Sequence, residues 1–219
     1  MKKLLFWIVL IVGTVALLGS CAKKDEDAAT TATFTSTTTA AGSITVGSVA
    51  MSGTYVGDCT TLSAAVVSGN FPSDVKAARD VLVVTGSDNI SEEFHGYTDT
   101  SCSSLSFYLK DGNDNFTVGV ASNGADGEIY HKVTYKETGF KTKAGTTVAE
   151  AFYENYFSTN SITKQGTAID LVVDTEYDVG GSGKNLLNLY SVTSTTVQTG
   201  EDDNATQPTE MDSWVMTKQ

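Results

Sequence analysis

The sequence predicts a mainly β protein: a single antiparallel up-and-down β-barrel of about eight to nine strands with one short helix, preceded by a disordered tether. Three observations favour this fold class. Short runs of alternating apolar and polar residues recur along the chain, separated by Gly, Asn and Asp. The two prolines, Pro72 and Pro208, fall outside these runs, where strands tolerate them. A clear helix start signal occurs at only one place.

The first twenty residues are typical of a bacterial export signal. Lys2 and Lys3 form a basic start, and 15 uncharged, mostly apolar residues follow from Leu4 to Leu18. A helix that spans a membrane needs about 20 apolar residues. The stretch therefore fits a removable signal peptide, residues 1–20, better than a permanent anchor.

Leu18-Gly19-Ser20-Cys21 resembles the lipobox of bacterial lipoproteins, in which an aliphatic and two small residues precede an obligatory cysteine. The resemblance implies cleavage before Cys21 and acylation of that cysteine, for example with palmitate. Each buried methylene adds about 0.8 kcal/mol of membrane affinity, so two or three acyl chains form a durable anchor. Ala22 stands where an aspartate would suggest inner-membrane retention, which implies the cell envelope, and the outer membrane in a Gram-negative cell. The alternatives are an uncleaved signal anchor, or secretion with an incidental Cys21.

Residues 21–44 are expected to form the lipidated N-terminus and the tether. From Ala22 to about Gly42 the chain is charged and then threonine-rich, with Phe34 as its only large apolar residue. Such a segment cannot bury enough surface to offset the entropy of ordering. We therefore expect it to hold the barrel domain, residues 45–219, away from the membrane surface.

Net charge limits the partners. Removing residues 1–20, with their two lysines, leaves 199 of 219 residues, and 12 basic residues against 26 acidic ones give a formal charge of −14. Such a surface repels phosphate backbones, so the sequence predicts no nucleic-acid binding. The acidity also argues against a domain held on anionic lipid by charge, and its simplest role is solubility.

Cys59 and Cys102 remain once Cys21 is lipidated. In an exported protein an even pair predicts one disulfide, and closing this loop is worth about 3–4 kcal/mol in the chain-entropy model. A metal pair or a redox pair is the alternative. No CxxC spacing is present, and only His95 and His131 could complete a metal site.

Strand patterns fill most of the domain, and turn residues follow at 111–114 and 123–127. A capping box, with Thr147 as N-cap and Glu150 three residues later, begins the one credible helix, whose aromatic stripe packs against the barrel or covers its open end. We also consider a short helix within Ser73–Asp80. The expected strands lie in Met51–Val56, Val81–Thr85, Ile90–Tyr97, Leu105–Lys110, Phe116–Val120, Ile129–Lys136, Ala168–Asp174, Asn185–Val192 and Met211–Thr217.

Two sequence features resemble the lipocalin-like β-barrel family. Gly53-Thr54-Tyr55 opens the first strand where lipocalins typically carry Gly-x-Trp, and Gln207–Trp214 precedes the final strand. Tyr97–Cys102 is also similar to segments of small, uncharacterised bacterial lipoproteins. The resemblance implies a small barrel with a central cavity or a filled core, and no catalytic residue carries over. An immunoglobulin sandwich is disfavoured because no tryptophan lies between the paired cysteines.

The sequence offers no constellation for catalysis, a metal or a cofactor. Gly180-Gly181-Ser182-Gly183-Lys184 lacks the first glycine and the final Ser or Thr of a phosphate-binding loop, so we expect a flexible hairpin loop. Asp111–Asn115 is a hairpin turn rather than a calcium loop, because a phenylalanine follows where calcium loops need glycine. Glu92 and Glu93 point to opposite faces of a strand and so form no catalytic pair. His95 and His131 are expected to be core or rim histidines. We therefore expect no enzyme.

The leading functional hypothesis is a binding module for a small apolar ligand inside the barrel, or for a protein or glycan partner at its rim. Apolar residues share one side of three successive strands, and Phe107 and Tyr135 are the candidate ligand contacts. A filled core would use the same residues. The alternative is therefore a structural or surface lipoprotein with a filled barrel and no ligand.

Replacement of Cys21 by alanine tests the predicted processing. Because the acyl chains would be attached to this thiol, the variant should stay uncleaved, or be released without detergent. Membrane partition and intact-protein mass measure this. Normal partition of the variant with an unaltered mature mass would show that the prediction is wrong.

Overall fold

The computed structural model describes residues 36–123, 129–200 and 207–219. The expected signal peptide, Cys21 and most of the expected tether lie outside these residues. The helices are α2 (Ala64–Val67) and α3 (Thr147–Thr159). The strands are β1 (Ile44–Val46), β2 (Val49–Met51), β3 (Thr54–Gly57), β4 (Thr60–Thr61), β5 (Ala77–Val84), β6 (Ile90–Tyr97), β7 (Leu105–Asn123), β8 (Ile129–Ala144), β9 (Thr163–Lys164), β10 (Thr167–Ala168), β11 (Glu176–Asp178), β12 (Asn185–Val192), β13 (Thr196–Gly200) and β14 (Met211–Lys218).

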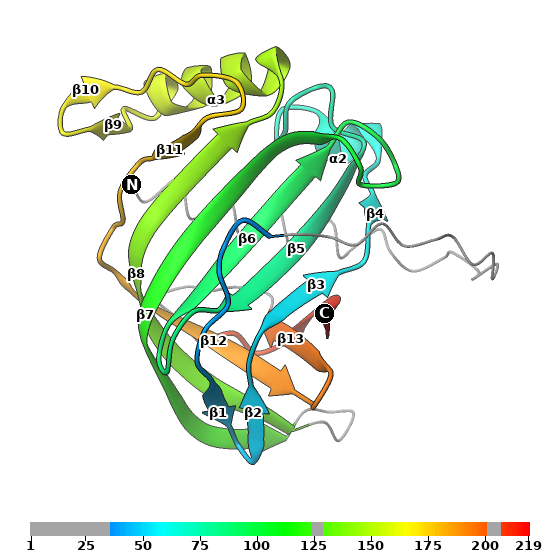
Figure 1. The fold of residues 1–219 in the computed structure, drawn as a ribbon, viewed down its shortest axis with the longest axis vertical. Helices are drawn as coiled ribbons and strands as arrows, with labels where there is room; N and C mark the ends of the chain where they lie inside the picture. The colour runs from blue at the N-terminus through cyan, green and yellow to red at the C-terminus, as the bar shows by residue number, and fades with distance from the viewer. Residues whose placement is uncertain (1–35, 124–128, 201–206) are drawn as a thin grey trace.

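Eight strands form a closed antiparallel barrel in the order β3-β5-β6-β7-β8-β12-β13-β14 (Figure 1). β14 returns to β3 through pairs such as Thr217 with Val56. Spatial neighbours follow chain order, so the barrel is an up-and-down meander. The mainly β, closed-barrel fold predicted from the sequence is confirmed. The short strand β11 pairs with β8 through residues 141–143, beyond the part of β8 that pairs with β12.

β7 is longer than predicted. The turn expected at 111–114 is wrong, because β7 continues from Leu105 to Asn123 and pairs with β8 over most of this length. Shifts in register between Gly112 and Asn113, and between Asp114 and Thr117, mark β-bulges. Asn115 has a φ of 55°, a left-handed conformation that asparagine tolerates. The turn-forming residues therefore bend the strand without ending it.

Three other expectations need correction. The expected strand Ala168–Asp174 is wrong beyond its first residue, because Ile169 and Leu171 pack into the core beside α3. The short helix considered within Ser73–Asp80 is also wrong: β5 begins in this range, and the short helix α2 lies earlier in the chain. The N-cap of α3 is Thr146, not Thr147, and its side chain accepts a hydrogen bond from the backbone of Ala149.

A hydrophobic cluster fills the half of the barrel nearer the β1–β2 hairpin. The hairpin itself adds Ile44, Val46 and Met51 to the cluster, and all three are buried. Every barrel strand contributes at least one buried side chain. In strand order these include Tyr55, Leu82, Ile90, Phe116, Val133, Leu186, Val197 and Met216.

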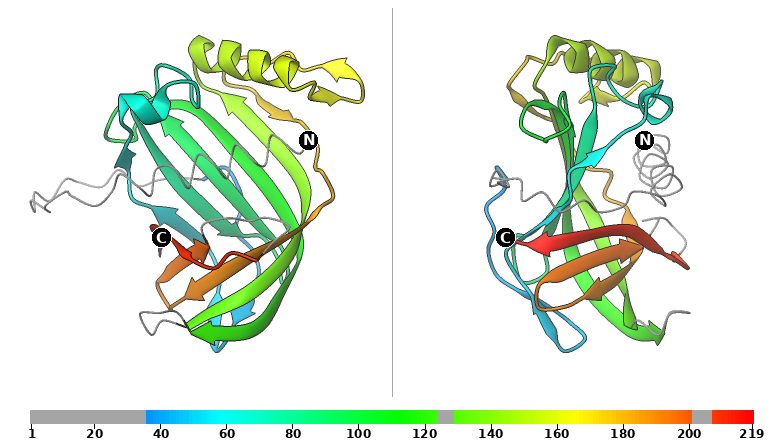
Figure 2. Two further views of the ribbon diagram at one scale, coloured as in Figure 1. Left: turned by 180° about the vertical axis from the view of Figure 1, so that it is seen from behind. Right: turned by 90° about the vertical axis from the view of Figure 1, so that its right-hand side faces the viewer.

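A second cluster lies on the same inner face, towards the helices. Phe94 is four residues from Ile90 on β6, so both side chains point inwards. Tyr153 and Phe157 of α3 pack into this cluster together with Phe107 of β7. Figures 1 and 2 show α3 and α2 at the end of the barrel opposite the β1–β2 hairpin. Among the described residues, no helix is long and apolar enough to cross a membrane.

Acidic side chains separate the two clusters. Asp80 lies between Ala78 and Leu82 on the inner face of β5, and Glu92 occupies the equivalent place on β6. Burial raises the pKa of Glu92, and hydrogen bonds from Tyr190 (2.7 Å) and other donors only partly oppose this. Burial, with repulsion from Asp212 and Glu92, raises the pKa of Asp80 well above its usual value.

The predicted disulfide between Cys59 and Cys102 is confirmed, with Cα atoms 5.9 Å apart. It joins the segment after β3 to the loop between β6 and β7. Asp99 organises this loop by accepting hydrogen bonds from the backbone N–H groups of Ser101, Ser103 and Ser104. The cross-link therefore fixes an ordered loop to the barrel wall.

Replacement of Asp80 by asparagine should stabilise the protein at pH 8. A raised carboxyl pKa means that the folded state favours the protonated form, by about 1.4 kcal/mol for each pKa unit. Its stabilising effect is present at low pH and lost as the pH rises through the folded-state pKa. The variant's free energy of unfolding should therefore exceed that of the wild type most at pH 8 and least at pH 5, as urea titrations can measure. The exposed Asp88→Asn is the control, and a similar gain in both variants would contradict the prediction.

Candidate functional site

The two predicted ligand contacts, Phe107 and Tyr135, lie inside the barrel and are buried. The ring centroid of Phe107 is 5.0 Å from that of Tyr153, and Tyr135 stacks on Phe116 at 5.7 Å. The Tyr135 hydroxyl lies 3.3 Å from the Glu92 carboxylate, to which it donates. Side chains of the protein itself therefore occupy the space around both residues.

Not every residue of the predicted apolar face is inside. β6 pairs with β7 only as far as Asn113, and β7 and β8 then extend as a hairpin. Val120 and Ile129 lie on this extension and are 72% and 57% exposed. His131 lies beside Gly47 of the β1–β2 turn, and its buried Nδ1 atom has no hydrogen-bond partner in the described part of the chain.

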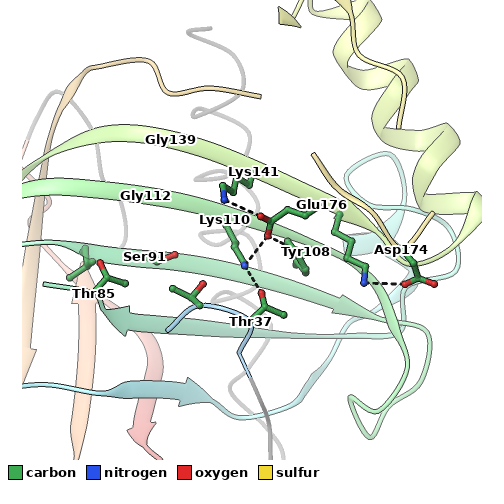
Figure 3. A pocket seen from close by; sticks show the side chains of 13 residues that line it. Thr37, Thr85, Ser91, Tyr108, Lys110, Gly112, Gly139, Lys141, Asp174 and Glu176 are labelled. Atoms are coloured by element: carbon green, nitrogen blue, oxygen red, sulfur yellow. Dashed lines mark hydrogen bonds and ion pairs between the residues drawn. The ribbon is translucent and has the colours of Figure 1, made fainter. Parts of the chain in front are cut away.

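A groove of about 580 Å³ lies on the outer face of the barrel, where β6, β7 and β8 meet β11 and the N-terminal segment (Figure 3). Because strand residues alternate, Lys110 and Lys141 point outwards while their neighbours Leu109 and Thr142 are buried. The lining residues are Thr37, Thr38, Thr85, Ile90, Ser91, Tyr108, Lys110, Gly112, Gly139, Lys141, Lys143, Asp174 and Glu176.

One end of the groove is built around the Glu176 carboxylate of β11. It accepts hydrogen bonds from the Tyr108 hydroxyl at 2.6 Å and from the ammonium groups of Lys110 and Lys141, each at 3.0 Å. Partial burial alone would raise the pKa of Glu176, but these three donors outweigh it and lower the pKa to about 2. A fixed carboxylate thus holds two lysines in place.

The lysines differ in how accessible they are. Lys110 is buried, whereas the side chains of Lys141 and Lys143 are 49% and 25% exposed. Lys143 pairs with Asp174 at 3.1 Å, and this aspartate is largely exposed. Three ammonium groups line the groove with two carboxylates, and a third carboxylate, that of Glu93, lies opposite Lys110 in the neighbouring strand.

The other end of the groove carries hydroxyl groups. Ser91 is only 7% exposed, and Thr85 lies beside it in Figure 3. Neither side chain makes a hydrogen bond to any described residue. Polar groups of largely buried residues are usually paired, so a serine hydroxyl that is accessible from the groove and has no partner among the described residues is suited to a partner from outside the chain.

Two paired glycines form the floor of the groove. Gly112 lies opposite Gly139 in the β7–β8 ladder. A Cβ atom added to Gly139 would meet no atom within 4 Å, and one added to Gly112 would come no closer than 3.6 Å to the Thr138 hydroxyl. The floor is therefore bare backbone, open to a flat molecule.

The N-terminal segment Ser36–Ser43, which we call the strap, forms one wall of the groove. Residues up to 44 were expected to belong to the tether, but the strap is hydrogen-bonded to the barrel. The Ser36 hydroxyl donates to Glu93 at 3.0 Å, and the Thr38 hydroxyl donates to the same oxygen. The His95 Nε2 atom lies 2.7 Å from the other Glu93 oxygen.

The carboxylate that holds the strap is buried on the outer face. Burial would raise the pKa of Glu93, but the hydrogen bond and charge of His95, the Thr38 hydroxyl and the charge of Lys110 outweigh it, so the pKa is lowered. Lys110 also donates to the Thr37 hydroxyl. The strap is thus held by buried charged groups and not only by backbone contacts.

The described residues contain no group of three or more His, Cys, Asp or Glu side chains that could hold a metal ion. No family model and no curated protein matches the chain. The groove must therefore be interpreted from its own residues.

The sequence does not predict this groove. Lys110 and Ser91 were assigned to strands, and nothing in the sequence links them to Glu176, which lies on a strand of three residues. The alternation of Lys110 with Leu109 was the one available signal, because it placed a lysine on the outer face.

Replacement of Glu93 by glutamine should release the strap. The neutral amide makes weaker hydrogen bonds than the carboxylate, so we expect a loss of about 1–3 kcal/mol in the free energy of unfolding. Hydrogen exchange should accelerate at Ala41, whose N–H donates to Val84. The exposed Glu210→Gln is the control. Unchanged exchange at Ala41 in the Glu93 variant would show that the strap does not depend on this carboxylate.

Proposed function

We propose that this protein is a lipid-anchored lipoprotein of the cell envelope, a binding module held to its membrane through acylated Cys21. In a Gram-negative cell the expected location is the outer membrane. Its ligand site is the groove on the outer face of the barrel. The proposal is for binding rather than catalysis, since the Ser36 and Thr38 hydroxyls donate to the Glu93 carboxylate, and it is this carboxylate, not either hydroxyl, that contacts the His95 imidazole.

One observation carries the proposal. The groove combines the hydroxyl of Ser91, a largely buried residue that makes no side-chain hydrogen bond to a described residue, with two accessible lysines over a floor of glycine backbone. Ligand sites are concave and contain a few precisely placed polar groups, and their volumes are roughly 300–1,000 Å³. At about 580 Å³ the groove has a suitable size.

The packing inside the barrel argues against the other binding hypothesis, a small apolar ligand in the interior. A small apolar ligand near Phe107 and Tyr135 would have to displace rings that already pack against Tyr153 and Phe116. This packing favours the alternative function, a structural or surface lipoprotein with a filled barrel and no ligand. The experiment below separates a groove ligand, an interior ligand and no ligand.

The Gly139→Val variant tests the proposal by filling the groove. Valine suits a strand, and a Cβ here meets no other atom within 4 Å, so the variant should fold normally. Acylated protein in detergent is applied to a panel of immobilised neutral and acidic glycans, and an apolar fluorescent probe is titrated in parallel. We expect wild-type protein to bind at least one glycan, with at least about tenfold weaker binding in the variant.

Lys132→Val is the matched control, because Lys132 is exposed on the same strand outside the groove. It should bind as the wild type does. Saturable binding of the apolar probe that persists in Gly139→Val would instead favour an interior ligand. Absence of saturable binding to glycans and probe alike would favour the filled barrel without a ligand.

A further inference from the structure

We infer that the groove recognises an acidic saccharide, a sugar unit that carries a carboxylate or a phosphate. Its ring lies on the Gly112–Gly139 floor, its hydroxyls face Ser91 and Thr85, and its anionic group faces Lys141 and Lys143. This inference rests on the proposed function, because it names the ligand class of the same groove.

The hydroxyl end is suited to a polyhydroxylated ligand. A hydroxyl both donates and accepts hydrogen bonds, and so does each hydroxyl of a sugar. Ser91 is more than nine-tenths buried, its side chain makes no hydrogen bond to a described residue, and it lines the groove, so its hydroxyl is accessible from the groove. Thr37 of the strap adds a further hydroxyl along one wall (Figure 3), and this hydroxyl accepts from Lys110, so its own proton is free to be donated to a ligand.

The floor is suited to a ring. Gly112 lies opposite both Ser91 and Gly139, so these residues form one row across the sheet, and Lys110 and Lys141 form the next row on the same face (Figure 3). Any larger residue at position 139 would project into the groove. A flat ring can therefore approach the sheet closely while its substituents reach both ends, and the volume admits about one or two rings of this size.

The lysine end is suited to one negative charge. Lys141 is half exposed, and among the described residues the one ion-pair partner of Lys143 is the largely exposed Asp174. Exposed ion pairs contribute little to stability, so exchange of Asp174 for a ligand anion would cost the protein little. Glu176 stays in place because three donors hold it, and its charge keeps Lys110 and Lys141 directed into the groove.

The net charge does not oppose such a ligand at short range. The chain is strongly acidic, but interactions between exposed charges fall off over about 8 Å at physiological salt. A small anion in the groove therefore responds mainly to the lysines beside it. A long polyanion would instead meet the acidic surface as a whole, which favours a single acidic sugar unit over a nucleic acid.

Isothermal titration of acylated protein in detergent tests the inference with four probes: glucose, glucuronic acid, glucose 6-phosphate and inorganic phosphate. We expect both acidic sugars to bind about tenfold or more tightly than glucose, because a charge-assisted hydrogen bond is added. Inorganic phosphate should bind more weakly than glucose 6-phosphate, because it lacks the ring and the hydroxyls. The relative affinities of glucuronic acid and glucose 6-phosphate identify the preferred acidic group.

Three variants test which part of the ligand each end of the groove contacts. Lys141→Met keeps the aliphatic stem and removes the charge, so it should weaken the acidic sugars about tenfold and leave glucose unchanged. Ser91→Ala should weaken all three sugars about fivefold by removing one neutral hydrogen bond. Lys132→Met, on the same strand outside the groove, should change nothing.

Four results would overturn the inference. Equal affinities for glucose and glucuronic acid would indicate a neutral-sugar site. Phosphate binding as tight as that of glucose 6-phosphate would indicate a simple anion site. Wild-type affinity for the sugars in Ser91→Ala would show that the Ser91 hydroxyl does not contact the ligand. If none of the four probes binds, acidic saccharides are not the ligand class. The proposed function has its own test. It is wrong if Gly139→Val leaves glycan binding unchanged, or if the wild-type protein binds no glycan of the panel.

Discussion

The pairing of β14 with β3 is the constraint on which the rest of the structure depends, because it joins the two ends of the sheet. Closure forces one side of every strand inwards, and each barrel strand then contributes a buried side chain to the same cluster. The β1–β2 hairpin packs against that cluster at one end, and α3 packs on the second cluster at the other. Folding therefore uses the inner face, and the outer face carries the strap and the groove.

Closure also explains why neighbouring carboxylates on β6 behave differently. Glu92 points inwards, where burial raises its pKa, whereas Glu93 points outwards, where His95, the Thr38 hydroxyl and Lys110 outweigh burial and lower its pKa. The direction of each shift follows from the face on which the side chain lies. Acidic groups inside the barrel weaken the fold at neutral pH, and those on the outer face hold its attachments.

Features of the structure that depend on residues close together in the sequence could be predicted from the sequence. Strict alternation placed Phe107 and Tyr135 on the inner face, and cysteine parity predicted the disulfide. The residues at 111–114 were typical of a turn, yet pairing with β8 kept them in a bulged strand, which only the tertiary structure decides. The groove could not be predicted from the sequence, because it also depends on tertiary structure. It joins Thr37, Ser91, Lys110, Gly139 and Glu176, which come from five separate segments of the chain.

The strap connects the proposed anchor to the proposed site. Its hydroxyls bind Glu93 and Lys110 on the outer face, and it also forms a wall of the groove. Only 14 residues lie between Cys21 and Ser36 in the sequence, so 15 Cα–Cα steps join them. A fully extended chain of that length reaches about 50 Å, and a flexible one spans about 20 Å on average. If Cys21 is acylated as proposed, the groove is confined to a thin layer beside the membrane. A ligand on the same membrane surface would then have a high effective concentration, so the groove could bind it even with weak affinity.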